Sequence, residues 1–219
     1  MKGASIEHHK NKEQLYSPLN IKYNRIIKRA FDLVVSAVVL CTLFPFICLI
    51  VGLIIKLTSP GPIFFVQKRT GKDGKDFNCY KFRSMKVNKE ANEMQATVND
   101  PRKTPFGNFI RNTSIDEIPQ FINVFLGDMS LIGPRPHMVK HTETYSKLIA
   151  NYMDRHAVKP GITGWAQVTG LRGETQELFQ MENRVKADIW YIENWSFQLD
   201  MKILVKTFLT ILLGDKNAY

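Results

Sequence analysis

The sequence predicts an α+β protein in which a small, irregular α/β domain lies between two elements that contact a membrane. Three observations lead to this fold class. Residues 33–55 contain no charged side chain. Two strand-like segments follow this run closely, and helical patterns dominate after them, without the regular alternation that produces a parallel sheet. The expected parts are a polar tail (1–20), a membrane element (21–57), a compact domain (58–198) and an amphipathic helix with a tail (199–219).

The uncharged run is long enough to cross a bilayer, since a straight helix over residues 33–55 would extend roughly 35 Å against about 30 Å of hydrocarbon. Pro45 lies in its middle and removes one helical hydrogen bond. Lys and Arg residues, which mark the cytoplasmic side, flank the run at both ends. We therefore predict a re-entrant helix–break–helix, bent at Pro45, that enters and leaves through one face. A kinked spanning helix is the alternative.

The compact domain is expected to begin with a β-hairpin. Residues 59–62 (Ser-Pro-Gly-Pro) break the preceding helix, and two apolar segments, 63–66 and 77–82, surround the turn residues 71–74. The segment 86–98 is expected to be a charged helix or a mobile loop. An apolar helix face then follows over residues 118–125 and ends at Gly127.

The rest of the domain alternates between helical and glycine-rich stretches. Residues 142–153 and 178–195 have helical periodicity, whereas the glycines of 159–173 indicate loop or short strand. Residues 199–213 are too short and too charged to span a bilayer. They are expected to form an amphipathic helix on the membrane surface. A helix packed on the domain core is the alternative.

The charge and the motifs restrict the classes of function. The formal net charge of +10 favours anionic partners, but the basic residues are spread and no nucleic-acid motif is present, so no nucleic-acid partner is expected. Three cysteines without zinc-ligand spacing indicate a reduced, cytosol-facing protein. There is no Walker loop and no GxGxxG after a strand, which argues against nucleoside triphosphatases and Rossmann oxidoreductases.

The most informative segment, residues 111–136, places two acids beside two arginines. Asp116 and Glu117 lie at the head of the expected helix, where Ser114 and Glu117 match a capping box and the helix dipole favours an ionised carboxylate. Side chains of adjacent helical residues point about 100° apart, so the two acids suit two different roles. One carboxylate can attack a phosphoryl group, and the other can hold Mg²⁺. A capped surface helix followed by a loop is the alternative.

Cations near the acids would neutralise phosphoryl oxygens. Arg111 and Arg135 are the nearest candidates, because an arginine fork matches two phosphate oxygens. Prolines on both sides stiffen the Arg135 loop. Lys81 and Arg83 alternate with aromatic residues and are expected to line one strand face, where a solvated face is the alternative. The candidate site residues are Asp116 and Glu117 (catalytic and Mg²⁺-binding) and Lys81, Arg83, Arg111, Pro134, Arg135 and Pro136 (substrate-binding).

Six motifs in a fixed order identify a resemblance that covers about residues 25–212. They are KRAFDLVVSAVVL, GPIFFVQKRTG, YKFRSM, DPRKTPFGNFIR, SIDEIPQFINVFLGDMSLIGPRP and KPGITGWAQVTG. In this order they resemble the bacterial sugar transferase family, the monotopic polyprenyl-phosphate hexose-1-phosphate transferases (phosphoglycosyl transferases). Larger relatives carry a multi-span region before the catalytic part, so the chain is expected to be the catalytic core alone.

The resemblance implies a reaction and a location. A hexose-1-phosphate would pass from a UDP-sugar to polyprenyl (undecaprenyl) phosphate with release of UMP, in a Mg²⁺-dependent ping-pong mechanism. This would be the first membrane step of exopolysaccharide, capsule or O-antigen synthesis. Asp116 matches the family's nucleophile and Glu117 its partner. Pro134, Arg135 and Pro136 match the element that contacts the nucleotide-sugar phosphates, Arg111 matches the arginine before the acids, and Pro45 matches the helix break.

The implied location is the cytoplasmic face of the bacterial inner membrane, with lipid, UDP-sugar and polyprenyl phosphate as partners. A membrane-anchored, metal-dependent phosphohydrolase is the competing enzyme, since it would need the same acids and cations with water as acceptor. A membrane adaptor that binds through its basic surface is the non-enzymatic alternative. The sequence leaves open which sugar is used and whether the protein forms a homo-oligomer.

Overall fold

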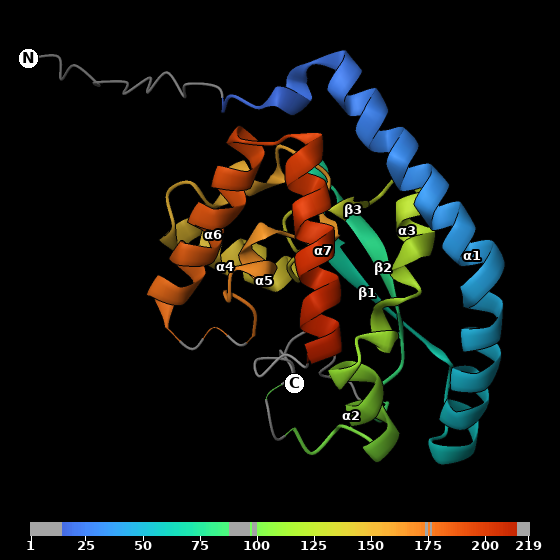
Figure 1. Ribbon diagram of the computed structural model, residues 1–219. Helices are drawn as coiled ribbons and strands as arrows, with labels where there is room; N and C mark the ends of the chain where they lie inside the picture. Colours follow the sequence, from blue (N-terminus) through green and yellow to red (C-terminus); the bar gives the residue numbers. More distant parts are fainter. Residues whose placement is uncertain (1–14, 88–96, 98–99, 174, 176, 214–219) are drawn as a thin grey trace, which may run out of the picture.

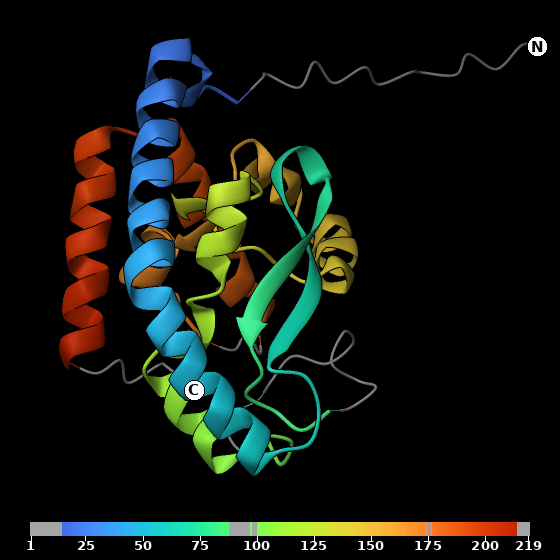
Figure 2. The same cartoon turned by 90° about the vertical axis from the view of Figure 1, so that its right-hand side faces the viewer.

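The computed structural model describes residues 15–87, 97, 100–173, 175 and 177–213 (Figure 1). Most of the predicted polar tail, most of the segment 86–98 and the last six residues lie outside this part. The described elements mix helices with two small sheets and confirm the α+β class. The long helix α1 runs along one side of a body formed by the other elements (Figures 1 and 2).

The helices and strands have the following bounds. The helices are α1 (Lys22–Thr58), α2 (Pro105–Asn112), α3 (Gln120–Leu126), α4 (Val139–Leu148), α5 (Trp165–Val168), α6 (Leu178–Glu193) and α7 (Phe197–Leu213). The strands are β1 (Phe64–Thr70), β2 (Asp76–Phe82), β3 (Ser130–Ile132) and β4 (Gly161–Thr163). Short 3₁₀ helices are η1 (Pro18–Asn20), η2 (Lys72–Gly74), η4 (Ile115–Glu117) and η5 (Tyr152–His156).

The predicted hairpin is confirmed. Strands β1 and β2 pair antiparallel from Phe64 opposite Phe82 to Thr70 opposite Asp76. The turn needs the left-handed backbone of Asp73 (φ 56°) and Gly74 (φ 73°). The second sheet is a short parallel pair, in which Ser130 lies opposite Gly161. Its strand β4 falls in the glycine-rich stretch that was expected to be loop or short strand.

Helix α1 corrects one prediction about the membrane element. It is a single helix over Lys22–Thr58 with Pro45 inside it, rather than two helices separated by a break. The helix changes direction about halfway along (Figures 1 and 2), as expected where a proline removes one hydrogen bond while the turns on both sides keep theirs. Within the described part of the chain, α1 is the one helix long and apolar enough to cross a membrane. Entry and exit through one face remain a prediction.

Polar contacts, as well as apolar ones, dock the first half of α1 on the body. The Lys28 Nζ atom lies 2.7 Å from an Asp200 carboxylate oxygen on α7. Arg29 donates to the backbone carbonyls of Val124 (2.6 Å) and Phe125 (2.8 Å) at the end of α3. Asp32 accepts from the Leu131 amide at 2.9 Å. Two of the basic residues before the apolar run therefore have structural partners and do not simply mark a membrane face.

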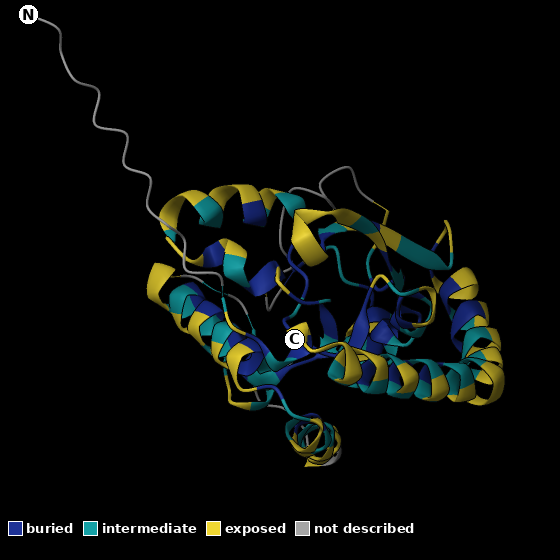
Figure 3. Cartoon of the chain, turned by 90° about the horizontal axis from the view of Figure 1, so that it is seen from above, coloured by how far each residue is buried: buried dark blue, intermediate teal, exposed yellow. Residues whose placement is uncertain are grey.

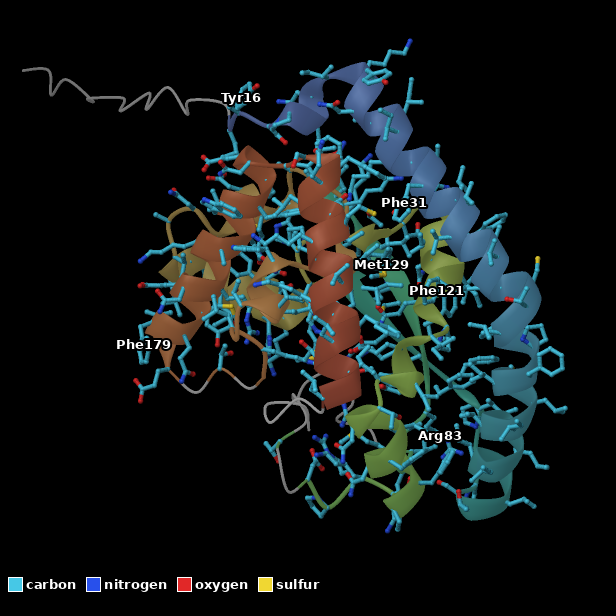
Figure 4. All side chains as sticks on the ribbon, viewed as in Figure 1. Tyr16, Phe31, Arg83, Phe121, Met129 and Phe179 are labelled. Carbon is cyan, nitrogen blue, oxygen red and sulfur yellow. The ribbon has the colours of Figure 1, made fainter. Side chains whose placement is uncertain are left out.

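Apolar side chains fill the space between α1 and the body. Phe31 and Phe121 pack against a buried cluster that includes Met129, and all three lie between the helix and the strands (Figure 4). Elsewhere α1 carries exposed and half-buried residues over most of its length (Figure 3). The exposed ones include Val38, Phe46 and Leu53. This distribution leaves a large apolar face without protein cover in the described chain, as a membrane element requires.

Helix α7 packs on the domain core, which was the alternative to a helix on the membrane surface; contact with a membrane stays a prediction. Leu199, Ile203 and Leu204 pack against the core, while Val205 and Phe208 are exposed. Asp200 is buried, where it accepts hydrogen bonds from Lys28, Tyr191 and Trp195. One face of α7 thus packs on the domain, and another leaves apolar side chains outside.

Candidate active site

An open cleft of about 620 Å³ lies between the β-hairpin, the segment after β3 and residues 171–173. This volume is in the usual range for a small-molecule site. Nine of its lining residues are Lys or Arg and three are Asp or Glu. Such an excess of cations, concentrated in a concave surface, favours an anionic ligand.

The acidic pair lies in this cleft, on a different local structure from the one predicted. Asp116 and Glu117 belong to the 3₁₀ helix η4, and the α-helix α3 begins only after Pro119. The predicted capping box is wrong, because Ser114 has a left-handed backbone (φ 56°) and makes no cap hydrogen bond. Its hydroxyl instead accepts from Arg172 at 3.2 Å. The helix therefore starts later than expected, although both acids still precede it within one turn.

Glu117 is held between two cations. Its Oε1 atom accepts from Lys81 Nζ at 2.7 Å and from Arg135 Nη2, and its Oε2 accepts from Arg135 Nη1 at 3.2 Å. Burial alone would raise the pKa of Glu117. The charges and hydrogen bonds of Arg135 and Lys81 outweigh that effect and hold its pKa well below the ordinary value. Glu117 is thus a permanent anion that fixes two cations at the cleft.

Asp116 has the opposite environment. It is 5% exposed, and no group in the described part of the chain donates a hydrogen bond to its carboxylate. Burial raises its pKa to about 6; Lys81 opposes the rise and the charge of Glu117 adds to it. The helix dipole was expected to keep this acid ionised, but burial has the larger effect. At pH 7 the carboxylate is still mostly ionised, and it is poorly solvated, as a nucleophile requires.

The backbone holds the Pro134–Pro136 segment in place. Three successive carbonyls each accept a hydrogen bond: Pro134 from the Gly161 amide (3.0 Å), Arg135 from Arg155 (2.8 Å) and Pro136 from Arg69 (3.0 Å). Arg155 is itself fixed by Asp188, with Nη2 2.6 Å from the carboxylate, and both are fully buried. Because the prolines lack amide donors, only carbonyls and the Arg135 amide need partners here. The segment therefore presents Arg135 from a rigid base.

Arg111 also reaches the cleft, as predicted. It lies at the end of α2, next to the turn that carries the acids, and its Nη1 atom is buried without a partner among the described residues. A buried guanidinium nitrogen without a partner is costly unless a ligand satisfies it. Lys81, Arg111 and Arg135 thus surround Asp116 and Glu117, as the sequence suggested.

Arg83 also lines the cleft, but most of its donors already have partners. Its guanidinium donates to the Ser59 hydroxyl (2.9 Å) and to backbone carbonyls of Ser59 (2.7 Å), Pro60 (2.8 Å) and Pro62 (2.6 Å). Figure 4 shows it beside the last turns of α1. Arg83 therefore fixes the exit of α1. A substrate contact for it stays a prediction that these bonds do not favour, since most of its donors are already used.

Sequence reasoning missed several residues that shape the cleft. Arg69, His137 and Gln167 line it, and Arg155 donates a hydrogen bond to the backbone carbonyl of Arg135. The position of His137, directly after the Pro-Arg-Pro triplet, was the one available signal. Arg155 and Asp188 are 33 residues apart in the sequence, so no local pattern could reveal their ion pair.

The acids also offer oxygen donors for Mg²⁺. No group of three or more His, Cys, Asp or Glu side chains occurs within the described residues, so the protein alone does not offer a closed cage. Mg²⁺ commonly takes one or two carboxylates and completes its shell with water and substrate phosphates. Asp116, whose carboxylate accepts no hydrogen bond from the described chain, fits that pattern. Glu117 beside it could contribute Oε2, because Oε1 already accepts from both Lys81 and Arg135.

Comparison with known proteins gives a consistent family. The model of the bacterial sugar transferase family matches residues 23–214. The chain is 54% identical to a UDP-glucose:undecaprenyl-phosphate glucose-1-phosphate transferase of Escherichia coli, over 90% of this chain and 42% of that protein. It is 50% identical to a protein of the same name from Klebsiella pneumoniae, over 93% and 43%.

A relative with another sugar in its name comes from Aeromonas hydrophila. This UDP-N-acetylgalactosamine-undecaprenyl-phosphate N-acetylgalactosaminephosphotransferase is 44% identical, over 94% of this chain and 48% of that protein. The chain therefore spans less than half the length of these three relatives. Because the family model covers nearly all of the described residues, the cleft and its acidic pair lie within the matched region. The chain belongs to the bacterial sugar transferase family.

Proposed function

We propose that this chain transfers a hexose-1-phosphate from a UDP-sugar to undecaprenyl phosphate and releases UMP. The observation that carries the proposal is the contrast between the two acids. Glu117 is bonded to Lys81 and Arg135, whereas Asp116 is buried, lacks donors in the described chain and has a pKa of about 6. The names of the relatives support both substrates.

In the first half-reaction, an oxygen of Asp116 attacks the β-phosphorus of the UDP-sugar. A new phosphorus–oxygen bond forms to the carboxylate, and the bond between this phosphorus and the bridging oxygen breaks. UMP leaves with that oxygen and its electron pair. Lys81, Arg111 and Arg135 offset the negative charge on the phosphoryl oxygens, which would otherwise repel the attacking carboxylate.

In the second half-reaction, a phosphate oxygen of undecaprenyl phosphate attacks the phosphorus of the acyl phosphate. The bond to Asp116 breaks and the carboxylate is restored, so the product is a sugar linked to the lipid through a diphosphate. One anhydride is exchanged for another through the acyl phosphate, which explains why no nucleoside triphosphate is required. Each substrate reacts in turn with the same Asp116, so one cleft serves both steps.

The lipid substrate can approach from the apolar face of α1. Phe44, next to Pro45, has its ring centroid 6.5 Å from that of Phe64 and 6.3 Å from that of Phe82. Phe64 and Phe82 also line the cleft. The bend of the apolar helix and the charged cleft therefore share one aromatic cluster. This arrangement supports a monotopic protein at the cytoplasmic face of the inner membrane, with the polyprenyl chain in lipid and its phosphate in the cleft.

Mg²⁺ is part of the proposal. Asp116 and Glu117 would hold it together with substrate phosphates, and the ion would neutralise charge on the phosphoryl group when bound. The role of the chain's own residues is to keep Lys81, Arg111 and Arg135 oriented toward the phosphates and to leave the Asp116 carboxylate without hydrogen bonds from the described chain.

The test uses the purified full chain in detergent micelles with Mg²⁺, undecaprenyl phosphate and UDP-glucose, the donor named in two of the relatives above. The expected result is UMP release matched by sugar phosphate in the lipid fraction, and exchange of labelled UMP into UDP-glucose without any acceptor. Asp116→Asn should lose both activities. Sugar phosphate released into water would support the phosphohydrolase, and exchange by Asp116→Asn would contradict the covalent step.

Single-cysteine variants at residues 20 and 60, labelled from each side of the membrane, test the topology.

A further inference from the structure

Unpartnered polar atoms are concentrated in the cleft. Eight buried side-chain nitrogen or oxygen atoms in the described residues lack a hydrogen-bond partner, and four of them belong to cleft residues: Arg69 Nε, Arg111 Nη1, His137 Nε2 and Gln167 Oε1. Burying such atoms without a partner is unfavourable, so they point to positions where a ligand binds. The two on arginines suit phosphate, whereas the other two belong to uncharged groups.

The His137 ring is fixed and neutral. Its Nδ1 atom lies 2.6 Å from the Tyr152 hydroxyl. Burial, followed by the positive charges of Arg155 and Arg184, holds the pKa of His137 well below its ordinary value. Since Nδ1 is used by Tyr152, the free position is Nε2, which is a donor or an acceptor depending on which atom of the Tyr152 pair carries the proton. A ligand hydroxyl can complement either state.

Gln167 supplies a second neutral atom from another element. It lies on α5, and its amide nitrogen donates to the Ile162 carbonyl at 3.3 Å, which leaves Oε1 as the unpartnered acceptor. Apolar residues of the same cleft, including Met138, Leu171 and Met181, accompany it. A few polar atoms among apolar side chains are typical of a site that orients an uncharged part of a ligand.

His137 lies close enough to Arg135, one of the cations proposed to bind phosphate, for one ligand to contact both. His137 follows Arg135 by two residues, which is roughly 6.6 Å in extended chain, and both line the cleft. Met138 forms an antiparallel bridge to Arg69, so the chain after the triplet runs beside β1. A ring attached to a diphosphate bound at Arg135 would therefore lie near His137, and Gln167 lines the same cleft.

We propose that His137 Nε2 and Gln167 Oε1 form a neutral hydrogen-bonding subsite for a hydroxyl-bearing ring of the nucleotide sugar. This inference rests on the proposed function. The ring is either the hexose or the ribose of the nucleoside, because both offer hydroxyls at a short distance from the diphosphate. The subsite contributes to the choice of donor and not to the chemical step.

Two variants remove the free atoms; the one at Gln167 also removes the 3.3 Å bond to the Ile162 carbonyl, so its thermal midpoint is compared with that of the unmodified protein. In His137→Asn, the side-chain amide can replace Nδ1 toward Tyr152 but has no atom at the position of Nε2; His137→Gln restores an atom there. Gln167→Met removes the acceptor at nearly constant volume. Gln198→Met, on the exposed first turn of α7, is the matched control.

The measurements are kcat and KM with UDP-glucose and UDP-galactose, the inhibition constant of UMP, and the thermal midpoint of each variant. We expect His137→Asn and Gln167→Met to raise KM about tenfold with kcat changed less than about threefold, consistent with the loss of one hydrogen bond. His137→Gln should recover most of the loss. Gln198→Met should behave as the unmodified protein.

The pattern across ligands identifies the ring. If the hexose binds here, the UMP inhibition constant stays constant and the ratio between the two donors changes. If the ribose binds here, KM and the UMP constant rise by the same factor. Unchanged KM and UMP constants in folded variants would overturn the subsite. Absence of turnover and of UDP-glucose binding in the unmodified protein would instead overturn the proposed function, so the two failures are distinguishable.

Discussion

The guanidinium of Arg135 lies alongside the carboxylate of Glu117, so that Nη1 donates to Oε2 at 3.2 Å and Nη2 donates to Oε1. Lys81 donates to the same Oε1 at 2.7 Å. The acid next to the proposed nucleophile therefore positions cations and is not itself free to attack. The carbonyl bonds to the Pro134–Pro136 segment complete this arrangement, because they fix the backbone that carries Arg135.

The first prediction concerns Glu117→Gln. The amide carries no charge and replaces one of the two acceptor oxygens with an NH₂ group, so that Arg135 loses its paired contact, and we expect kcat/KM to fall at least about tenfold and the free energy of unfolding to fall by about 1–3 kcal/mol. Steady-state kinetics and denaturant titration measure the two effects. Asp73→Asn is the control, since Asp73 pairs with Lys72 at 3.4 Å on an exposed turn and its loss should leave both values unchanged. Equal behaviour of the two variants would contradict the positioning role.

The second prediction is that Asp116→Asn is more stable than the unmodified protein. Folding raises the pKa of Asp116 from 3.8 to about 6, which corresponds to a cost of about 3 kcal/mol at neutral pH. Below pH 3.8 the group is protonated in both states, so the cost is absent there. It grows as the pH rises through 3.8 to 6 and is complete above 6.

Thermal midpoints of both proteins at pH 4.5 and pH 7.5 test this. The advantage of Asp116→Asn should be about 1–3 kcal/mol at pH 7.5 and much smaller at pH 4.5. An inactive variant that is also more stable would show that the acid is kept for chemistry and not for folding. A variant less stable at pH 7.5 would mean that the carboxylate has stabilising partners.

The third prediction concerns the pH dependence of the reaction. Only ionised Asp116 can attack phosphorus, so kcat/KM should rise with pH through an apparent pKa near 6 and level off above it. Because Asp116 and Glu117 interact, this value belongs to the pair. In Glu117→Gln the negative neighbour is gone, so the acid limb should move to lower pH. The rate of UMP release between pH 4.5 and 8.5 measures the apparent pKa on the acidic side of the profile. If this pKa is the same in Glu117→Gln, the titrating group is not Asp116.

Local sequence patterns predicted the structural features that depend on residues close to one another in the sequence. Glycines at 71 and 74 revealed the hairpin turn, the uncharged run revealed the helical membrane element, and the spacing of apolar residues revealed α6 and α7. The acids and arginines were recognisable by type and proximity in the sequence. The capping box failed because Ser114 has a left-handed backbone, and its hydroxyl accepts from Arg172, 58 residues away, instead of capping the helix. No pattern within a few residues can weigh such a competing partner.

Partners distant in the sequence also determine the environment of two charged residues. A charge on an amphipathic helix normally indicates the solvated face, yet Asp200 is buried because Lys28, Tyr191 and Trp195 all bond to it. Arg83 seemed free to bind phosphate because the return of the chain from α1 to β1, which uses its donors, is visible only in three dimensions. Tertiary partners decided the role in both cases.

The fourth prediction tests whether the β3–β4 pair positions Arg135. A Cβ atom at Gly161 would lie 2.1 Å from the Gly133 nitrogen and 2.5 Å from the Thr163 oxygen, both backbone atoms that cannot move alone. The Gly161 amide also donates to the Pro134 carbonyl at 3.0 Å, so any shift of β4 reaches the triplet. We expect Gly161→Ala to lose about 1–3 kcal/mol of unfolding free energy. Its kcat/KM should also fall at temperatures where it remains folded.

Gly52→Ala is the matched control, because the nearest atom there is the Ile63 Cδ1 methyl at 3.2 Å, which can rotate away. It should change stability by less than about 1 kcal/mol and leave kcat/KM intact. If Gly161→Ala lost stability but kept full kcat/KM, the parallel pair would support the fold without setting the position of Arg135. In that case the bonds from Arg155 and Arg69 would be sufficient to hold the segment, and Arg155→Met should then lose activity where Gly161→Ala does not.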